Sequence, residues 1–409
     1  MEILTIIYLT YSFIALYFLF LFFLIYIPNR KEMFNFPNLT KEYSLSIVIP
    51  CHNEEETIGG TINSLLELDY KGLKKIIVVD DCSTDNSYKV IEAIAKKHPK
   101  VMLVKTPKNT GKASGAKNYG AKFVNTELIG FVDADSYPQK DSVNKMVGFF
   151  DDIKTGAVTS QVLVKRREKF IEKLQAIEYK IIAFSRKLLG FIDAIYVTPG
   201  PLAIYRKEVF DKVGGFDENN LTEDIEITWH IVYSGYNVKM SLPAKAHTIS
   251  PDNLKDWFKQ RIRWNVGGIQ TINKYKKTFL KKGMLGNFIL PFFLFSWFVG
   301  IFGIFILTYR FLRRIFINYF FTAYSIKAQT ALLTLRDINL TPNVLVFFGI
   351  GILILSLSFT AIVLLHLRET EFKKHGFLNI LSYMFVYLLA YPFLLIASIY
   401  KFLRKKRSW

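Results

Sequence analysis

Long runs of apolar residues bracket a central region in which short apolar runs alternate with polar segments. Four runs contain no charged side chain: residues 3–27, 288–308, 344–365 and 377–400. Each run reaches the roughly 20 residues that an α-helix needs to cross a bilayer, so the pattern predicts four membrane-spanning helices. The first run is too long for the apolar core of a signal peptide and has no basic segment before it, which favours a retained anchor.

A fifth apolar segment, residues 311–335, is less regular. It is long and aromatic, but it contains Arg313, Arg314 and Lys327. Charged side chains are costly at the centre of a bilayer. The segment therefore agrees with a fifth crossing, a re-entrant piece or an interfacial helix, and the sequence leaves these three alternatives open.

The central region alternates patterns typical of buried strands with patterns typical of amphipathic helices. The predicted strands are residues 45–50, 75–80, 101–104, 128–132 and 157–164, and the predicted helices are residues 54–68, 86–97, 111–124 and 169–189. Such alternation predicts an α/β domain with a doubly wound sheet, whose ligands bind beyond the carboxyl ends of the strands. Residues 197–206 and 213–216 are expected to be rich in loops.

The patterns divide the chain into four parts. We predict an N-terminal transmembrane anchor (residues 1–28), an α/β domain (44–252), an interfacial region (253–285) and a C-terminal transmembrane region (286–409). The last part has three clear spans, and residues 311–335 are the candidate for a fourth. The interfacial part contains an amphipathic pattern over residues 253–277, which suits a helix lying on the membrane surface.

The distribution of charge agrees with this division. The 409 residues carry a formal net charge of +19 and are 51% apolar, and lysines and arginines gather beside the apolar runs, at residues 30–31, 274–282 and 404–407. Basic flanks are typical of the cytosolic ends of membrane spans, so we expect an integral protein of the cell membrane with a cytosolic α/β domain and the lipid bilayer as a partner. No basic stripe with RNA-type aromatic motifs occurs, and no nucleic-acid partner is expected.

An Asp-x-Asp pair, Asp133 and Asp135, follows the predicted strand 128–132. Two carboxylates one residue apart can share a hard cation such as Mg²⁺ or Mn²⁺, whose remaining positions are open to substrate phosphates. Such a cation stabilises the negative charge that develops on a departing diphosphate. The motif alone is weak evidence, because Asp-x-Asp pairs are also common on protein surfaces.

Polar residues also follow the first two predicted strands. Asn53 and Glu54 come after the first strand, and Asp80 and Asp81 end the second. Because ligands bind at the carboxyl edge of such a sheet, Asp80 and Asp81 are candidates for binding a nucleotide. A helix cap is the alternative for this motif, because residues 83–85 are good N-cap residues. The glutamates after the first strand can complement the dipole of the following helix.

Two later motifs supply further candidates. Glu223 and Asp224 belong to a Thr-Glu-Asp triplet, which either handles a proton or simply opens a helix. Gln260, Arg263 and Trp264 form a Gln-x-x-Arg-Trp pattern on one face of the predicted helix. Arg263 can bind a diphosphate through two hydrogen bonds, and Trp264 offers a stacking face for an acceptor sugar. A Trp-Arg belt at a membrane interface is the alternative.

The order of these motifs resembles that of the membrane-bound family 2 glycosyltransferases of the cellulose, hyaluronan and poly-N-acetylglucosamine synthase type. Residues 50–56 (PCHNEEE) are similar to the family's Pro-x-Tyr-Asn-Glu-Glu opening, and by this resemblance Asn53 and Glu54 are candidates for the nucleotide side. Gly111, Lys112, Ala113 and Asn118 are similar to the family's Gly-Lys-x-x-Ala-x-Asn run, which makes Lys112 a candidate for a phosphate or nucleotide contact, with a solvated lysine as the alternative. The chain departs from the family at His52, which replaces tyrosine, at Cys82, which replaces glycine, and at residues 199–201. There, Pro-Gly-Pro replaces the usual small residues of a gating loop, which leaves the identity of the acceptor open.

The resemblance implies a GT-A-like nucleotide-sugar domain that is anchored by transmembrane helices. It implies inverting transfer from an α-linked, UDP- or GDP-linked sugar to form a β-glycosidic bond. By resemblance, Asp224 with Glu223 beside it accepts the proton of the acceptor hydroxyl, Asp135 with Asp133 holds the metal, and Asp81 binds the nucleotide. Two enzymes are compatible with these features: one adds a sugar to a membrane-associated glycan or lipid-linked acceptor, and one extends an exported polysaccharide. A non-catalytic membrane sugar-binding or export protein is a further alternative.

Overall fold

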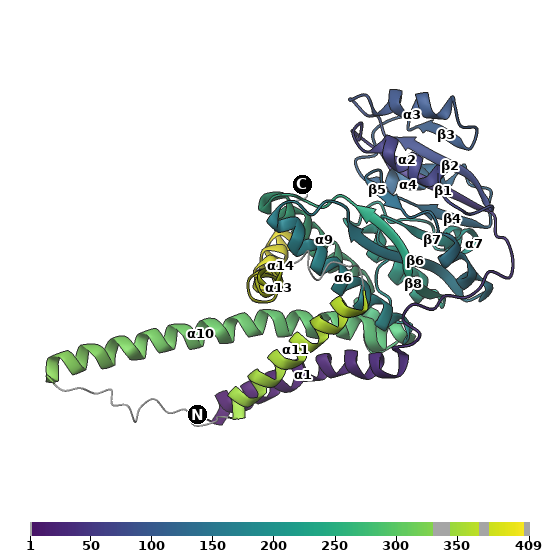
Figure 1. Cartoon of the computed structure of the whole chain (residues 1–409). Coiled ribbons are helices and arrows are strands. Elements are labelled where there is room, and N and C mark those ends of the chain that lie inside the picture. The colour runs from purple at the N-terminus through teal and green to yellow at the C-terminus, as the bar shows by residue number, and fades with distance from the viewer. Residues whose placement is uncertain (1, 330–343, 368–375, 405–409) are drawn as a thin grey trace.

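The computed structural model of the chain describes residues 2–329, 344–367 and 376–404. It has two parts, an α/β domain and a group of long helices that extends away from it (Figure 1). Segments from both ends of the chain meet in the helical part. Helix α1 (Glu2–Asn29) lies beside α11 (Val344–His366), and the hydroxyl of Tyr26 is 3.0 Å from Nε2 of His366.

An eight-stranded mixed sheet forms the centre of the α/β domain. In spatial order its strands are β3 (Val101–Lys105), β2 (Leu73–Asp80), β1 (Leu45–Cys51), β4 (Leu128–Phe131), β7 (Ala203–Arg206), β6 (Thr155–Val164), β8 (Asn237–Thr248) and β5 (Ser136–Pro138). The first four strands pair in parallel, β7 is antiparallel to both of its neighbours, β6 and β8 are parallel, and β5 is antiparallel to β8. The predicted α/β class is confirmed, but the sheet is mixed.

Helices cover both faces of the parallel half of the sheet. Every residue of β1 is buried, as expected for a strand with helices on both sides. On one face α4 (Ala113–Ala121) approaches closely, because a Cβ added to Gly120 would lie 2.5 Å from Cγ1 of Val48. On the other face, Ile47 and Ile49 share an apolar cluster with residues of α2 (Ile58–Leu66), α3 (Ser87–Ala95) and α5 (Asn144–Val147).

The other half of the sheet was harder to predict. The sequence pattern predicts loops over residues 197–206, whereas residues 203–206 form β7, and the pattern predicts neither β5 nor β8. Strand β8 contains a proline and two lysines among its twelve residues, which hides its strand pattern. It forms because it pairs along nearly its whole length with β6, every residue of which is buried. Pairing with neighbouring strands therefore outweighs local propensity here.

Two helices connect the α/β domain to the long helices. Helix α6 (Phe170–Gly190) packs on β6 and β8, and it also contacts α1, α11 and α13 (Phe377–Ser382). Helix α9 (Leu254–Tyr275) contacts α8 (Glu223–Tyr233) and lies beside α14 (Leu388–Leu403). The helices that the sequence predicts over residues 169–189 and 253–277 are both present. The remaining short elements are α7 (Lys207–Lys212) and the turns η1 (Gly148–Asp151) and η2 (Lys276–Thr278).

Four helical segments among the described residues are long and apolar enough to cross a membrane: Ile6–Asn29, Leu285–Ala328, Phe347–His366 and Leu378–Leu403. In the most apolar stretch of each segment, only 6% to 28% of the residues are buried inside the protein. The exposed apolar side chains therefore need another apolar environment. The protein is therefore an integral membrane protein. The second segment consists of η3 (Leu285–Ile289) and α10 (Leu290–Ala328), and the last consists of α13, η5 (Tyr383–Tyr387) and α14.

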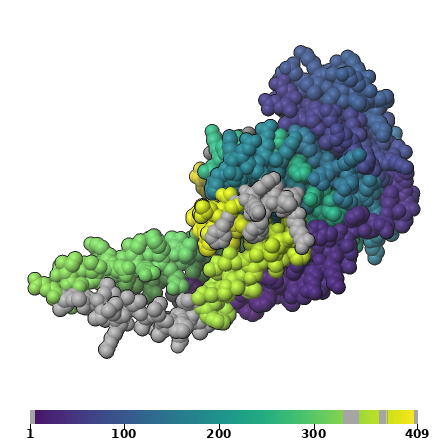
Figure 2. All heavy atoms as spheres, in the orientation of Figure 1, coloured from purple at the N-terminus to yellow at the C-terminus, as the bar shows by residue number. Residues whose placement is uncertain are grey.

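Helix α10 is longer than a membrane span requires. Its 39 residues correspond to about 58 Å at 1.5 Å per residue, nearly twice the hydrocarbon thickness of a bilayer. Figure 2 shows it projecting away from the rest of the molecule. Residues 311–328, part of the candidate fourth C-terminal span, continue α10 without a turn, so no separate crossing is present in this described part. Residues 330–335 of that candidate lie outside the described residues.

Candidate active site

Four candidate carboxylates lie beyond the ends of two strands that flank β1. Asp80 ends β2 and Asp81 follows it, and Asp133 and Asp135 follow β4. Because β1, β2 and β4 are parallel, their carboxyl ends meet at the same edge of the sheet, where ligands of α/β proteins bind. The structure therefore places the four residues along one edge.

The carboxylate of Asp81 organises a loop beside this edge. It accepts hydrogen bonds from Oγ1 of Thr106 at 2.7 Å and from the backbone nitrogen and Oγ1 of Thr110 at 3.0 Å and 2.7 Å. Asp80 is fully buried, and its Oδ1 accepts a hydrogen bond from the backbone nitrogen of Ser83 at 3.2 Å. The two aspartates thus shape the turns after β2 and β3.

A pocket of about 400 Å³ opens beside the loop that Asp81 holds. It is lined by Thr106, Pro107, Lys108, Thr110, Gly115, Asn118, Tyr119, Lys122 and Glu218. Lys112 lies near it, and its ammonium donates a hydrogen bond to the backbone oxygen of Glu218 at 2.7 Å. Lys112 therefore connects the start of α4 to the segment before α8. The pocket falls within the size range of small-molecule sites.

Asn53 and Glu54 fix the turn between β1 and α2. Asn53 has a left-handed backbone conformation with φ of 56°, and its Oδ1 accepts a hydrogen bond from the backbone nitrogen of Thr84 at 2.8 Å. The backbone nitrogen of Glu54 donates to Oγ of Ser87 at 2.7 Å. These bonds join the turn after β1 to the turn after β2, and the charge of Glu54 acts on Asp135.

Asp133 and Asp135 fit a divalent cation. Oδ1 of Asp135 accepts hydrogen bonds from Oγ of Ser136 at 3.1 Å and from Oγ1 of Thr248 at 3.3 Å. Burial raises the pKa of Asp135 to about 6, and the charge of Asp133 adds to the shift. A bound cation would relieve this repulsion and favour both carboxylates. Among the described residues no group of three His, Cys, Asp or Glu side chains could hold a metal, so a cation here would need oxygens from substrate phosphates and water.

Lys117 connects the two acidic motifs, and the sequence analysis does not single it out. This residue of α4 is 2% exposed, and its ammonium is 3.1 Å from Oδ1 of Asp133 and 2.9 Å from Oε1 of Glu223. Burial alone would lower the pKa of Lys117, but the two carboxylates raise it well above the ordinary value, so the lysine stays charged. A lysine among the small, buried residues of α4 is the signal that could have revealed it.

Glu223 and Asp224 begin α8 and differ in their electrostatics. Burial would raise the pKa of Glu223, but the charge and hydrogen bond of Lys117 outweigh burial and lower it. Burial and the adjacent charge of Glu223 raise the pKa of Asp224, although Lys117 and Arg263 act in the opposite direction. Glu223 is therefore held as a carboxylate, whereas Asp224 binds a proton more readily.

The segment 197–201, which the resemblance relates to a gating loop, lies between the two acidic motifs. The backbone nitrogen of Asp133 donates to the oxygen of Gly200 at 3.1 Å, and a Cβ added at Gly200 would lie 2.0 Å from Oδ2 of Asp133. Glycine is therefore needed at this position. The hydroxyl of Thr198 is 2.9 Å from the hydroxyl of Thr228 in α8. The loop thus contacts both the Asp-x-Asp motif and the helix that carries Asp224.

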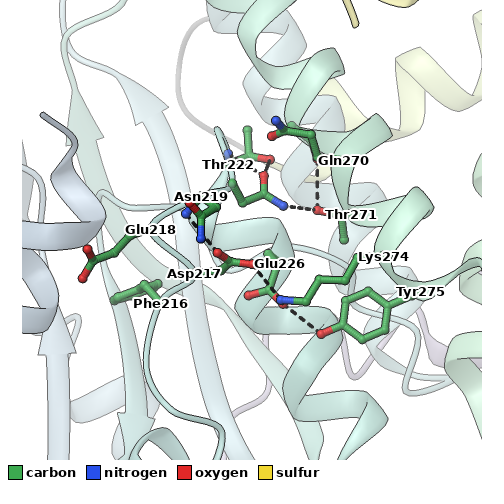
Figure 3. Close-up of polar contacts among 12 residues, drawn as sticks. Phe216, Asp217, Glu218, Asn219, Thr222, Glu226, Gln270, Thr271, Lys274 and Tyr275 are labelled. Carbon is green, nitrogen blue, oxygen red and sulfur yellow. Dashed lines mark hydrogen bonds and ion pairs between the residues drawn. The ribbon is translucent and has the colours of Figure 1, made fainter. Parts of the chain in front are cut away.

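Polar contacts also tie α8 to α9 (Figure 3). The ammonium of Lys274 is 2.6 Å from Oε1 of Glu226, and the hydroxyl of Tyr275 donates to the same oxygen at 2.8 Å. Two turns earlier in α9, a Cβ added at Gly267 would lie 2.1 Å from Oγ1 of Thr222. The glycine lets α9 pack directly on the Thr-Glu-Asp triplet, and the charged contacts fix the two helices in this arrangement.

The Gln-x-x-Arg-Trp residues of α9 have different surroundings. Arg263 is exposed, its Nη1 is 3.4 Å from the backbone oxygen of Leu221, and its charge acts on Glu223 and Asp224. Trp264 is half-buried against the apolar cluster of β6 and α6. The side-chain oxygen of Gln260 accepts a hydrogen bond from Arg261, and among the described residues no hydrogen bond or ion pair joins Gln260 to the acidic residues of the site.

Arg261, which the sequence analysis does not select, joins this motif to the membrane helices. It is 1% exposed and forms an ion pair with Glu178 of α6, and its guanidinium lies 4.1 Å from the ring centroid of Trp264. The hydroxyl of Tyr387 in η5 donates to Glu178 at 2.6 Å and accepts a hydrogen bond from Nε1 of Trp257 at 2.6 Å. Arg261 thus orients Trp264 and anchors α9 between α6 and the last membrane segment.

Comparison with known proteins identifies the α/β domain. The model of the family described as "Glycosyl transferase family 2" matches residues 46–214. This segment is a family 2 glycosyltransferase domain. The chain is 30% identical over 260 residues to the poly-β-1,6-N-acetyl-D-glucosamine synthase of Staphylococcus aureus (strain COL), which covers 63% of this chain and 62% of the synthase. It is 31% identical over 250 residues to the enzyme of the same name from Staphylococcus epidermidis, covering 61% and 60%. The chain thus spans less than two thirds of these relatives.

A solved structure extends the likeness to the membrane helices. The mannosyltransferase of Pyrobaculum calidifontis, solved in complex with GDP-Man and Mn²⁺, matches with a TM-score of 0.60 and 19% identity over 97% of this chain and 100% of that chain. At this identity the likeness concerns the fold alone. The family 2 domain of this chain therefore has the GT-A-like sheet that the resemblance implies, together with a group of long apolar helices.

Proposed function

We propose that the protein is an inverting membrane glycosyltransferase of the hexosyltransferase type. It moves a sugar from a UDP- or GDP-linked donor to a membrane-associated glycan or lipid-linked acceptor and forms a β-glycosidic bond. The observation that carries this proposal is the buried bridge of Lys117 between Asp133 and Glu223, because it joins a motif suited to the donor to a motif suited to the acceptor in one site. The family 2 domain supports the same reaction class.

Asp224 is the proposed base. Its pKa is raised, so it accepts a proton more readily than Glu223, which Lys117 holds in the charged form. As the acceptor oxygen attacks the anomeric carbon, Asp224 takes the proton of that oxygen. The bond between the anomeric carbon and the diphosphate breaks on the opposite side of the sugar, and the nucleoside diphosphate leaves with the bonding electron pair. In this mechanism Glu223 positions Lys117 and Asp133, and it does not exchange a proton.

The parallel half of the sheet would bind the donor. The turns at its carboxyl edge lie next to the pocket. They contain the candidate residues Asn53, Glu54, Asp80, Asp81 and Lys112. Asp133 and Asp135 would hold Mg²⁺ or Mn²⁺, which supplies positive charge to the departing diphosphate. Arg263 is exposed, and its charge acts on Glu223 and Asp224. It adds a positive charge for the same diphosphate, and Trp264 and Gln260 would border the acceptor.

The orientation follows from the basic residues beside the apolar segments. Arg30 and Lys31 follow α1, and Lys274 to Lys282 precede α10. By the preference of basic loops for the cytosol, the glycosyltransferase domain faces the cytosol of a cell membrane, where nucleotide sugars are made.

A processive synthase of an exported polysaccharide is the second candidate. The relatives named as poly-β-1,6-N-acetyl-D-glucosamine synthases favour it, since they are 30–31% identical to this chain over 250–260 residues. Both candidates use the same chemistry and differ only in whether the product stays bound for another addition.

The test is a panel of UDP- and GDP-linked sugars incubated with the purified full chain and membrane lipids, with and without excess EDTA. Released nucleotide and product mass are measured. We expect release from one class of donor and its loss in EDTA. No release from any donor contradicts the proposed activity, and unchanged release in EDTA contradicts the metal. High-mass polymer formed from donor alone, without added acceptor, selects the processive enzyme.

A further inference from the structure

A buried arginine outside the motifs has hydrogen-bond donors without acceptors. Arg186 of α6 is 5% exposed, and its Nε and Nη1 atoms are buried without a hydrogen-bond partner among the described residues. An unpaired charge of this kind costs several kcal/mol to bury, so it persists only where another requirement opposes its loss. Two other buried cations of the site, Arg261 and Lys117, both form ion pairs with carboxylates, and the buried Lys187 donates to a backbone oxygen. Arg186 differs from these three in having two buried donors without a hydrogen-bond partner among the described residues.

Arg186 lies on the acceptor side of the site. Its charge acts on Asp224, the proposed base, and on Tyr196, which precedes the 197–201 loop. It does not share the surroundings of Arg263, which is exposed and contacts the segment before α8. The donor side, by contrast, is formed by the turns after β1, β2 and β4. An anion beside Arg186 would consequently belong to the acceptor and not to the diphosphate of the donor.

The surroundings of Arg186 border the membrane part of the protein. The ring of Tyr196 packs edge-to-face on Phe293 of α10 with 4.8 Å between the centroids. Phe293 also contacts Trp229 at 5.9 Å, and Nε1 of Trp229 is another buried donor without a partner. Helix α6 itself contacts α1, α11 and α13. Buried donors without partners in the described part of the chain thus lie on α6 and α8, which both pack against the long apolar segments.

We propose that Arg186 binds the phosphate of a lipid-linked acceptor. This inference rests on the proposed glycosyltransfer and adds the chemical class of the acceptor. Phosphate oxygens would accept charge-assisted hydrogen bonds from the free donors of the guanidinium, while the lipid chain remains among the membrane helices. The acceptor would then be held by its anionic group with its attacking oxygen towards Asp224. A neutral glycan offers no such anion, so the subsite favours a lipid phosphate over a growing polysaccharide.

The experiment compares three probes on the purified full chain: a polyisoprenyl phosphate, the matching polyisoprenol and inorganic phosphate. Binding is measured by calorimetry without donor, and nucleotide release is measured separately with donor. The wild type should bind the lipid phosphate more tightly than the alcohol or inorganic phosphate. Arg186→Met should weaken binding of the lipid phosphate by about ten- to a hundredfold and leave the alcohol unchanged, as expected for the loss of hydrogen bonds to a charged group. Arg186→Lys should restore part of the affinity.

Lys187→Met is the matched control. Lys187 is the next residue of α6, is also buried and basic, but donates to the backbone oxygen of Met240 at 3.2 Å. Its loss should leave the preference for the lipid phosphate unchanged, and the same result after Arg186→Met overturns the proposal. Inorganic phosphate that binds as tightly as the lipid phosphate overturns the lipid assignment. If the wild type releases no nucleotide from any donor, the glycosyltransfer fails, while the calorimetry still decides whether Arg186 selects a lipid phosphate.

Discussion

The two halves of the site hold their acidic residues by different means. On the nucleotide side, Asp81 is held by hydroxyl and backbone N–H donors from a loop 25 to 29 residues further along the chain. On the acceptor side, Glu223 is held by the ammonium of Lys117, 106 residues away, and Glu178 by Arg261 and by Tyr387, the latter 209 residues away. Local neutral contacts thus hold Asp81 on the proposed nucleotide side, whereas charge pairs between distant elements hold the carboxylates of the proposed acceptor side, and the same lysine also pairs with Asp133.

This difference has a physical consequence. A carboxylate that accepts several neutral hydrogen bonds is satisfied within one βα unit, so the donor side depends little on the rest of the protein. A buried ion pair fails badly when one partner is lost, because the other charge remains without compensation. The acceptor side should therefore be sensitive to any change that separates the α/β domain from the membrane helices.

The largest effect is expected from Arg261→Met. It leaves the buried carboxylate of Glu178 without its positive charge partner, so the variant should lose about 3–5 kcal/mol of stability. Thermal unfolding of the purified protein in detergent measures the change. Arg263→Met removes an exposed arginine from the same helix and should cost less than about 0.5 kcal/mol. The double change Glu178→Met with Arg261→Met should recover part of the stability. Equal losses in the two single arginine variants would disprove the structural role of the Arg261 pair.

The next effect concerns Lys117, which joins the two halves. Lys117→Met should lower turnover by about 10²-fold, the usual cost of removing one preorganised charge from an active site. It should also strengthen Mn²⁺ binding, because the ammonium that pairs with Asp133 no longer competes for its carboxylate; electron paramagnetic resonance of added Mn²⁺ reports this directly. Lys96→Met is the control, since Lys96 pairs with Glu92 on the surface and should change neither quantity. Normal Mn²⁺ binding and turnover after Lys117→Met would rule out the bridge.

A smaller effect separates the two neighbouring carboxylates. The lowered pKa of Glu223 means that its charge stabilises the fold above the ordinary carboxyl range, and this contribution is lost as the pH falls. The raised pKa of Asp224 means that its charge costs stability at neutral pH, and acid relieves the cost. At pH 7.5, Glu223→Gln should destabilise on the order of 1 kcal/mol, whereas Asp224→Asn should not. The difference between the two variants in their change of unfolding free energy should shrink towards pH 5. Equal changes in the two variants at both pH values would contradict the opposite pKa shifts assigned to Glu223 and Asp224.

Much of the donor side could be predicted from the sequence. Apolar runs mark β1, β2 and β4, and their carboxyl ends coincide with Asp80, Asp81 and the Asp-x-Asp pair, because the parallel half of the sheet is regular and buried on both faces. The antiparallel half could not be predicted in the same way. Strand β8 has lysines and a proline in its pattern, and only its pairing with β6 makes it a strand.

The contacts of the acceptor side could not be predicted from the sequence, for a different reason. The spacing of Gln-x-x-Arg-Trp points to Arg263 and Trp264, but the buried arginine is Arg261, whose partners come from α6 and η5. Lys117 and Arg186 belong to helices whose patterns predict only packing. Their importance depends on burial and on the absence or presence of a nearby carboxylate, and the fold alone determines both.

The proposed mechanism depends most directly on Asp224 as the group that accepts the proton of the acceptor. The direct measurement compares wild type with Asp224→Asn for turnover and for binding of the donor nucleotide sugar, in the same preparation. The asparagine keeps the shape of the side chain and loses its ability to accept a proton, so turnover should fall by at least ~10²-fold. Donor binding and thermal stability should be preserved. Turnover near that of the wild type, or a loss of turnover matched by an equal loss of donor binding, would contradict the account.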